Sequence, residues 1–262
     1  MKVYKFALLG ALMLLLAFSS GCRRLRARDQ LNKGVGAFRN AQFQAAIMHF
    51  KQAVSLDPTL LNARLYLATA YFQQYVPGGE SPENVKIGQQ AIDAFEEVLK
   101  VDPNNTTAIA SVGQTYFYMK QFEKAKEYQR HWVEVEPNNP VPYHWIGMLD
   151  WAIVFPRTQQ MRKDLKIEFP KDPNNPSSLP PFPEKARAQL EEQNAPLVKE
   201  GVETLEKAIQ LNPNDFDTMS TLNLMYRQKA DLEPDAAARQ ADLKVADDWV
   251  SKAIALRKAG GT

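Results

Sequence analysis

The chain has few of the residues from which metal and catalytic sites are usually built. It contains one cysteine, Cys22, and three histidines, His49, His131 and His144, among 262 residues. The histidines show no metal-ligand spacing, and there is no second cysteine to complete a metal site. No glycine-rich phosphate loop and no Gly-x-Ser-x-Gly elbow occurs in the sequence. The sequence therefore predicts no catalytic residue, no metal and no cofactor.

Apart from its first residues, the chain also lacks an excess of positive or negative charge. The formal net charge is +2, from 32 basic and 30 acidic residues. Lys2 and Lys5 lie in the stretch 1–21, which has no acidic residue, so the remainder carries 30 basic residues against 30 acidic ones. This balance gives no argument for nucleic-acid binding, and we predict no nucleic-acid partner. The composition, 45% hydrophobic and 24% charged, is that of an ordinary folded protein.

One apolar run stands out, and it lies near the N-terminus, from Phe6 to Phe18. It is shorter than the roughly 20 residues that a membrane-crossing helix needs, but it suits a secretory signal. The residues after it, Ser19-Ser20-Gly21-Cys22, resemble a bacterial lipobox, with Ser19 where that motif usually has Leu. The resemblance implies a signal peptide at 1–21, cleaved before Cys22, and lipid attachment to that cysteine. The alternatives are an uncleaved membrane anchor, or an ordinary signal followed by an incidental cysteine.

A basic stretch follows the cysteine, and we expect residues 22–26 to form a lipidated basic tether. Its arginines either contact anionic headgroups or are simply solvated. They are Arg23, Arg24 and Arg26, with Arg28 close behind. Arg23, rather than Asp, follows the cysteine, and by resemblance to enterobacterial lipoproteins this favours the outer membrane. The predicted location is the bacterial cell envelope, with the chain anchored by lipid in the outer membrane and facing the periplasm.

A helical repeat pattern fills most of the remaining chain and is clearest in the stretch 106–139. Gly113 and Ala125 are small residues at positions where two antiparallel helices approach closely, and Tyr116 fills the space between them. Pro137 ends the second helix. These residues, at these offsets, resemble a tetratricopeptide repeat of about 34 residues. The resemblance implies an all-α fold, a right-handed superhelix or α-solenoid of about five such repeats with insertions.

The other repeats are placed by the same pattern, and three of them depart from it. The predicted repeats are repeat one at 27–60, repeat two at 61–105, repeat three at 106–139, repeat four at 140–215, and repeat five with a C-terminal capping helix at 216–262. Repeats two and five each carry 11 surplus residues, and we expect much of this surplus to extend the second helix, by about three turns. In repeat two, Pro77-Gly78-Gly79 predicts a loop, and Ser81 before Pro82 predicts the start of the second helix. Repeat four is interrupted by a proline-rich insertion at about 152–194, expected to be extended from Phe155 to Pro183 and helical again from Glu184.

The inner surface of the array is the predicted binding site. In tetratricopeptide-repeat proteins the first helix of each pair lines a concave groove that holds peptides. The residues at the corresponding positions and beside them are Phe38, Phe72, Phe117, Tyr118, His144, Met148, Trp151 and Arg227. The aromatic side chains either form an apolar trough for a partner or pack on the neighbouring repeat.

One subgroup of the family grips a peptide's C-terminal carboxylate with Lys, Asn and Arg side chains. At those positions this chain has different residues, namely Leu31, Val35, Tyr66, Thr107 and Ser111. We therefore predict no binding of a peptide tail through a carboxylate clamp.

These features together predict a non-catalytic, lipid-anchored scaffold that binds a protein or peptide partner in the periplasm, in envelope assembly or secretion. The size, anchor and repeat number resemble the repeat lipoprotein of the outer-membrane β-barrel assembly machine, and pilus pilotins share the plan. The alternative is a small-ligand binder or an enzyme, in which the insertion closes a pocket over His144, Trp145 and Trp151. The insertion itself is expected either to cover the groove as a lid or to dock on a partner.

Overall fold

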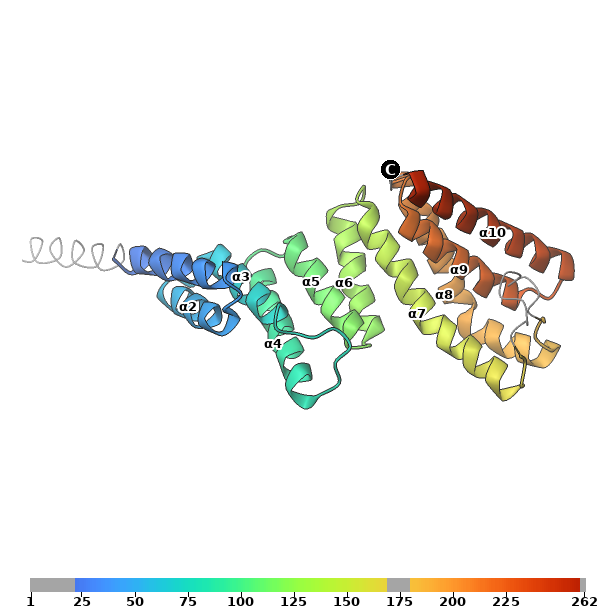
Figure 1. Cartoon of the computed structure of the whole chain (residues 1–262), viewed down its shortest axis with the longest axis horizontal. Coiled ribbons are helices and arrows are strands. Elements are labelled where there is room, and N and C mark those ends of the chain that lie inside the picture. Colours follow the sequence, from blue (N-terminus) through green and yellow to red (C-terminus); the bar gives the residue numbers. More distant parts are fainter. Residues whose placement is uncertain (1–21, 169–179, 260–262) are drawn as a thin grey trace, which may run out of the picture. The chain divides into compact units, whose positions relative to one another are not determined.

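The computed structural model describes residues 22–168 and 180–259, and all regular secondary structure in these ranges is α-helical (Figure 1). The predicted signal peptide and the middle of the predicted insertion lie outside the described residues. Contacts divide the chain into two compact units, which we call unit one, ending at Lys120, and unit two, beginning at Gln121. The division falls inside predicted repeat three, between its two helices.

Unit one is a series of helices joined by short turns, apart from a longer loop at residues 73–81. After a first helix at 22–39 come α2 (Phe43–Leu56), α3 (Leu61–Phe72), α4 (Pro82–Leu99) and α5 (Thr106–Tyr118). Local sequence sets several of their ends. The Ser81 hydroxyl accepts a hydrogen bond from the Asn84 amide at the start of α4, and the Asn105 side chain accepts one from the Ala108 amide at the start of α5. These are N-caps, which satisfy amides that have no partner within the helix.

The first helix differs from the sequence prediction at its beginning. Residues 22–26 were expected to form a tether, but they are helical and continuous with the helix at 22–39. The physical reason is that Ala27, one turn on, is fully buried and therefore fixes the start of the helix against its neighbours. Further along, Gly34 lies against the ring of Phe50, so closely that a Cβ atom there would be 2.4 Å from a ring carbon. This close approach packs the first helix on α2.

The surplus residues of repeat two form a loop as well as a longer helix. Helix α4 has 18 residues against the 14 of α2, so it gains about one turn rather than the three expected. The rest of the surplus lies between α3 and α4, where Asn84 holds the loop. Its side chain accepts a hydrogen bond from the Val76 amide at 2.8 Å and donates to the carbonyl oxygens of Val76 and Gly79, each at 2.8 Å. The loop is therefore an ordered part of unit one.

Unit two consists of helices of 14 to 28 residues, which lie side by side in Figure 1. They are α6 (Phe122–Val135), α7 (Pro140–Asp164), α8 (Glu184–Leu211), α9 (Phe216–Leu232) and α10 (Ala236–Ala259). Helix α7 packs against α8 and α9, and α9 packs against α10.

The predicted extended excursion is shorter in the structure, because α7 continues to Asp164 through Pro156. A proline inside a helix removes one backbone hydrogen bond, but tertiary contacts can compensate. Here Val154, Thr158 and Arg162 are buried on one side of α7 while Pro156 is exposed, so the packed face keeps the helix intact. The structure confirms the predicted return to helix at Glu184.

Repeat five accommodates its surplus differently from repeat two. Helix α9 has 17 residues and α10 has 24, and only residues 233–235 separate them. Both helices of the pair are thus lengthened, whereas repeat two adds a loop and one turn. The two surpluses are equal in length, but the two repeats accommodate them by different structures.

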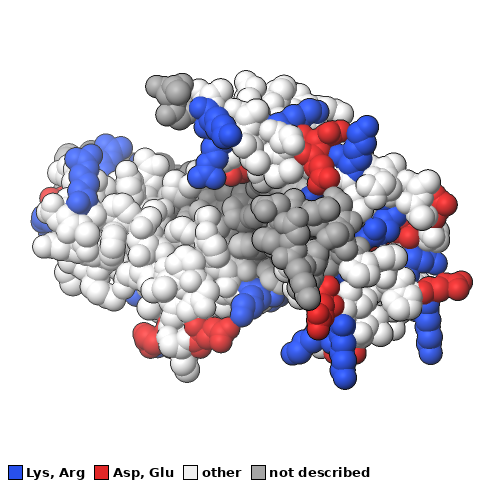
Figure 2. All heavy atoms as spheres, turned by 45° about the vertical axis from the view of Figure 1, so that its right-hand side comes forward, with Lys and Arg blue, Asp and Glu red and all other residues white. Residues whose placement is uncertain are grey.

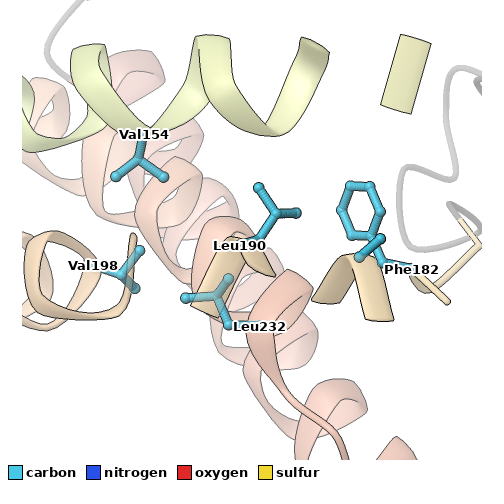
Figure 3. Close-up of a cluster of buried hydrophobic side chains, with 6 residues drawn as sticks. Val154, Phe182, Leu190, Val198 and Leu232 are labelled. Carbon is cyan, nitrogen blue, oxygen red and sulfur yellow. The ribbon is translucent and has the colours of Figure 1, made fainter. Parts of the chain in front are cut away.

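The ends of α7, α8 and α9 enclose one of the hydrophobic clusters of unit two. Figure 3 shows side chains from all three helices directed toward one another, with the ring of Phe182 from the segment before α8 beside them. The buried members are Val154, Phe182, Ala186, Leu190, Val198 and Leu232. Two of these residues also line the pocket described next.

Candidate peptide-binding pocket

A pocket of about 460 Å³ opens between α8 and α9, at the turn that leads into α10. Its floor is apolar and consists of Ala195, Val198, Val202, Leu232 and Pro234. Its charged rim consists of Glu191, Lys199, Glu203, Lys229 and Glu233. Ligand sites commonly combine an apolar interior of this size with a few polar groups at the edge. The arrangement suits the side chain of a peptide, or a small molecule.

The helical period of α8 explains why apolar and charged residues separate at this pocket. Ala195, Val198 and Val202 follow one another at intervals of three and four residues, so they share one face of the helix. Lys199 and Glu203 lie one position further on and are exposed. The pocket therefore forms where the apolar face of α8 lies beside the end of α9.

Several rim charges are already paired within unit two. Lys229 donates to Asp242 of α10 at 2.7 Å and lies over the ring of Tyr226. Glu191 accepts a hydrogen bond from Arg187 at 2.7 Å. The charges of Lys229 and Glu191 are therefore compensated within unit two. Lys199, also at the rim, is a cation exposed to solvent.

A second feature of unit two is a partly buried ionic network that joins α6, α7 and α8. The Lys126 ammonium contacts Asp150 and also Glu200, the latter at 3.2 Å, and Arg130 donates to Glu200 at 2.6 Å. Burial raises the pKa of Asp150 to about 7, against the opposing effect of Lys126. Burial also acts to raise the pKa of Glu200, but Arg130 and Lys126 outweigh it and the pKa is lowered.

A third cluster fixes the segment before α8. The guanidinium of Arg162 donates to Asp231 at 2.6 Å and to the carbonyl oxygen of Pro180 at 3.2 Å, and it lies over the ring of Phe182. Burial raises the pKa of Asp231, with Arg162 acting in the opposite direction. Because every group in this cluster faces another protein group, we interpret it as structural.

The predicted groove residues of unit one are half-buried and contact other aromatic rings. The ring of Phe38 lies 5.4 Å from that of Phe43, centroid to centroid, and Phe72 lies 6.4 Å from Phe95. Phe117 and Tyr118 are adjacent, with ring centroids 5.6 Å apart. Each aromatic therefore packs within unit one and keeps part of its surface exposed. Their contact with a partner stays a prediction.

The predicted groove residues of unit two are also half-buried: His144, Met148, Trp151 and Arg227. Trp151 stacks on Phe155 at 4.8 Å between centroids, and Arg227 donates to Asp247 of α10 at 2.6 Å.

His144 belongs to a hydrogen-bonded chain at the start of α9. The Thr218 hydroxyl donates a hydrogen bond to Asp215 at 2.7 Å, and its oxygen lies 2.8 Å from His144 Nδ1, so it accepts a hydrogen bond from that nitrogen. Burial lowers the pKa of His144, although Asp215 opposes this. The pocket between α8 and α9 is lined by other residues, and the alternative pocket over His144, Trp145 and Trp151 stays a prediction.

Sequence reasoning missed the pocket, although its residues carried a weak signal. Val198 and Val202 are spaced as helix residues, but they lie at the border of the predicted insertion, where the repeat pattern does not apply. The contribution of α9, through Lys229 and Leu232, depends on α9 being longer than the family pattern. Only the packing of the two helices brings these residues together.

Two searches of the described residues complete the account of the site. Among residues 22–168 and 180–259, no group of three or more His, Cys, Asp or Glu side chains is arranged to hold a metal ion. Within the same described ranges, no helix has the length and hydropathy needed to cross a membrane.

Comparison with known proteins identifies the repeat. Residues 107–139 match the family described as Tetratricopeptide repeat, and this is the stretch that the sequence placed as repeat three. The Hsp70-Hsp90 organizing protein of Triticum aestivum is 31% identical over 113 residues, which are 43% of this chain and 18% of that protein. The mitochondrial import receptor subunit TOM70 of Homo sapiens is 29% identical over 108 residues, which are 41% of this chain and 17% of that protein. The chain thus spans less than a fifth of the length of these curated relatives.

Solved structures extend the likeness over most of the chain. MamA from Desulfovibrio magneticus RS-1 covers 90% of this chain and 98% of its own, with a TM-score of 0.58 and 17% identity. YrrB is described as a TPR protein with an unusual peptide-binding site. It covers 87% of this chain and 90% of its own, with a TM-score of 0.53 and 14% identity. Such low identities show the fold alone. The fold is that of an all-α tetratricopeptide-repeat protein, and none of these descriptions names an enzymatic activity.

Proposed function

We propose that the chain is a non-catalytic scaffold, anchored by lipid at Cys22, that binds a protein or peptide partner of the bacterial envelope. In this proposal the repeats face the periplasm from the outer membrane and serve envelope assembly or secretion. The observation that carries the binding function is the pocket between α8 and α9, an apolar floor with a charged rim on a repeat fold. Such a pocket accepts one apolar side chain of a partner and holds its neighbours by polar contacts.

The comparisons support a peptide as the ligand class. One similar structure is described as a repeat protein with a peptide-binding site, and similar curated proteins are described as an organizing protein and an import receptor. The carboxylate-clamp positions hold no basic residue, so we propose recognition of an internal segment rather than a peptide's C-terminus.

The state of Cys22 supports the anchoring part of the proposal. Its side chain is free and exposed, at the start of the described part of the first helix, and is therefore open to modification. If the lipobox-like motif is processed, Cys22 becomes the first residue of the mature chain and carries the acyl groups. Several acyl chains would anchor the protein durably, whereas a single chain gives only reversible binding.

The binding proposal is tested by filling the pocket. Ala195→Leu adds three carbon atoms at the pocket floor, whereas Ala241→Leu makes the same change at an exposed position on α10 and serves as the matched control. Crosslinking and affinity capture from native membranes, followed by mass spectrometry, identifies partners of the parent chain. We expect Ala195→Leu to lose them and Ala241→Leu to keep them. Equal capture by both variants, with parental thermal stability, would exclude the pocket.

The aromatic residues of unit one provide a second test in the same assay. A Phe72→Ala/Phe117→Ala variant, combined with Trp151→Ala of unit two, removes three of the predicted aromatic groove side chains. If the variant stays folded and loses a partner that Ala195→Leu retains, the groove is the contact surface. If it retains the partners, these aromatics serve packing alone, as their ring contacts within each unit already suggest.

The anchoring proposal is tested by Cys22→Ser expressed from the full sequence. We expect the parent to incorporate a labelled fatty acid and to fractionate with outer membranes, and Cys22→Ser to lose the label. Incorporation of label into Cys22→Ser would place the modification elsewhere, and absence of label from both would remove the anchor from the proposal.

A small ligand in the same pocket is the second candidate, because the volume of about 460 Å³ falls in the range of small-molecule sites. A panel of metabolites tested by thermal unfolding separates the two candidates. A ligand at a hundred times its dissociation constant adds roughly 2.7 kcal/mol of stability. A metabolite that stabilises the parent but not Ala195→Leu would favour the small-ligand candidate, and a flat panel would favour the peptide.

A further inference from the structure

The first two turns of the helix at 22–39 form an exposed surface of unusual composition. Leu25 is 71% exposed, more than any other large hydrophobic residue in the described part of the chain. Cys22 and Arg26 are also exposed. Residues at i, i+3 and i+4 of a helix share a face, so Cys22, Leu25 and Arg26 point the same way. Ala27, on the other side of the helix, is fully buried in unit one.

This surface carries a concentration of positive charge. Residues 22–28 hold four arginines and no acidic residue, and none of the four forms an ion pair with a described residue. Asp57 has a lowered pKa, chiefly through a hydrogen bond from Thr59, and the charges of Arg24 and Arg28 contribute further. Those two arginines thus lie toward α2. The carboxylate that follows Arg26 by one helical turn, that of Asp29, is paired with Lys33 at 2.7 Å.

We propose that this surface docks on an anionic lipid bilayer, with Leu25 in the interface and the arginines at the headgroups. The chemistry is that of a short amphipathic helix: an apolar side chain beside several cations is complementary to an anionic, partly apolar surface. The inference deepens the proposed anchoring, because Cys22 lies on the same face as Leu25 and its acyl groups would enter the membrane there. The helix continues directly into unit one, so unit one is held at the membrane surface without a flexible spacer.

The lipid contact is tested apart from acylation. The chain from residue 22 onward with Cys22→Ser carries no acyl group, and its binding to vesicles of phosphatidylglycerol and phosphatidylcholine is measured by co-sedimentation, with phosphatidylcholine vesicles for comparison. We expect binding to the mixed vesicles alone, falling as salt is raised. Equal binding to both vesicles, or to neither, overturns the proposal.

Matched variants then assign the binding to this surface. Each basic side chain near an anionic membrane contributes about fivefold to the partition constant, so Arg23→Gln/Arg26→Gln should bind about 25-fold more weakly. These two arginines are chosen because they are not the ones that affect Asp57. The control, Arg257→Gln/Lys258→Gln, removes the same charge from exposed positions at the end of α10 and should bind like the parent. An equal loss in the control would mean that net charge, and not this surface, drives binding.

Insertion of residue 25 is measured directly. The four native tryptophans all lie in unit two, so Leu25→Trp places a single indole in unit one. Brominated lipids in the mixed vesicles should quench the added emission while leaving the parental emission unchanged. Unquenched emission from vesicle-bound Leu25→Trp overturns the insertion. Because acylation is measured separately on Cys22, an unmodified cysteine would leave this surface contact standing, and a failed vesicle assay would leave the acyl anchor standing.

Discussion

The ammonium of Lys126, on α6, forms an ion pair with Asp150, on α7, and both side chains are buried in unit two. The second carboxyl oxygen of Asp150, Oδ2, has no hydrogen-bond partner in the described part of the chain. The pair connects two helices, and Glu200 brings in α8 at 3.2 Å from the Lys126 nitrogen. Two buried charges of opposite sign compensate each other only while both are present.

Removing one partner of the Lys126–Asp150 pair should cost more stability than replacing both partners with apolar residues. We expect Lys126→Met to lower the free energy of unfolding by about 3–5 kcal/mol, because Asp150 is left buried without its partner. The double variant Lys126→Met/Asp150→Leu should recover most of the loss, since no charge then remains uncompensated at that point. Chemical denaturation followed by tryptophan fluorescence reports on unit two, which contains all four tryptophans. Additive losses in the double variant would contradict the coupling.

The raised pKa of Asp150 predicts a pH dependence of stability. The ordinary pKa of the carboxyl is 3.8, and in the folded chain burial raises it to about 7. The folded state therefore binds a proton that the unfolded state releases, and the contribution of Asp150 to the free energy of unfolding falls as the pH rises from about 4 to about 7. Asp150→Asn cannot titrate and should lose this part of the slope. Denaturation at a series of pH values compares the slopes, and equal slopes in parent and variant would rule out Asp150 as the source.

Two glycines on the first helix should respond oppositely to the same substitution. A Cβ at Gly34 would come within 2.4 Å of the Phe50 ring, whereas one at Gly36 would meet no atom within 4 Å. Gly34→Ala should therefore destabilise unit one by about 1–3 kcal/mol through overpacking. Gly36→Ala should stabilise it by about 0.5–1 kcal/mol, because alanine restricts the unfolded chain and favours the helix. Thermal unfolding followed by circular dichroism checks both, and the same sign for the two would refute the packing argument.

The loop of repeat two should depend on a single side chain. Asn84→Ala removes three hydrogen bonds to the backbone of Val76 and Gly79, and we expect a loss of roughly 2–3 kcal/mol with faster hydrogen exchange at the Val76 amide. Asn62→Ala, at an exposed position on α3, is the control and should leave exchange unchanged. Unaltered exchange at Val76 in Asn84→Ala would show that the loop is held by other contacts.

Much of the helical framework could be predicted from local sequence because the residues that specify it are close together in the chain. Gly113, Tyr116 and Ala125 marked one helix pair, and the matching family stretch confirms it. Helix starts were equally local, as at Ser81 and at Glu184. The candidate site was far less predictable, since the pocket joins α8 to α9 through residues that are not neighbours in the sequence.

Proline shows most clearly where local reasoning fails. Pro156 predicted an extended chain, but the buried side chains of Val154 and Arg162 keep α7 helical around it. The sequence by itself determined the all-α class, the repeat period and the positions of several helix ends, because these depend on side chains within one or two turns. The tertiary structure alone decided how the surplus residues were used, which charges were buried together and where the pocket opens. Each of these depends on contacts between helices, whose free energy exceeds the local preference of a single residue.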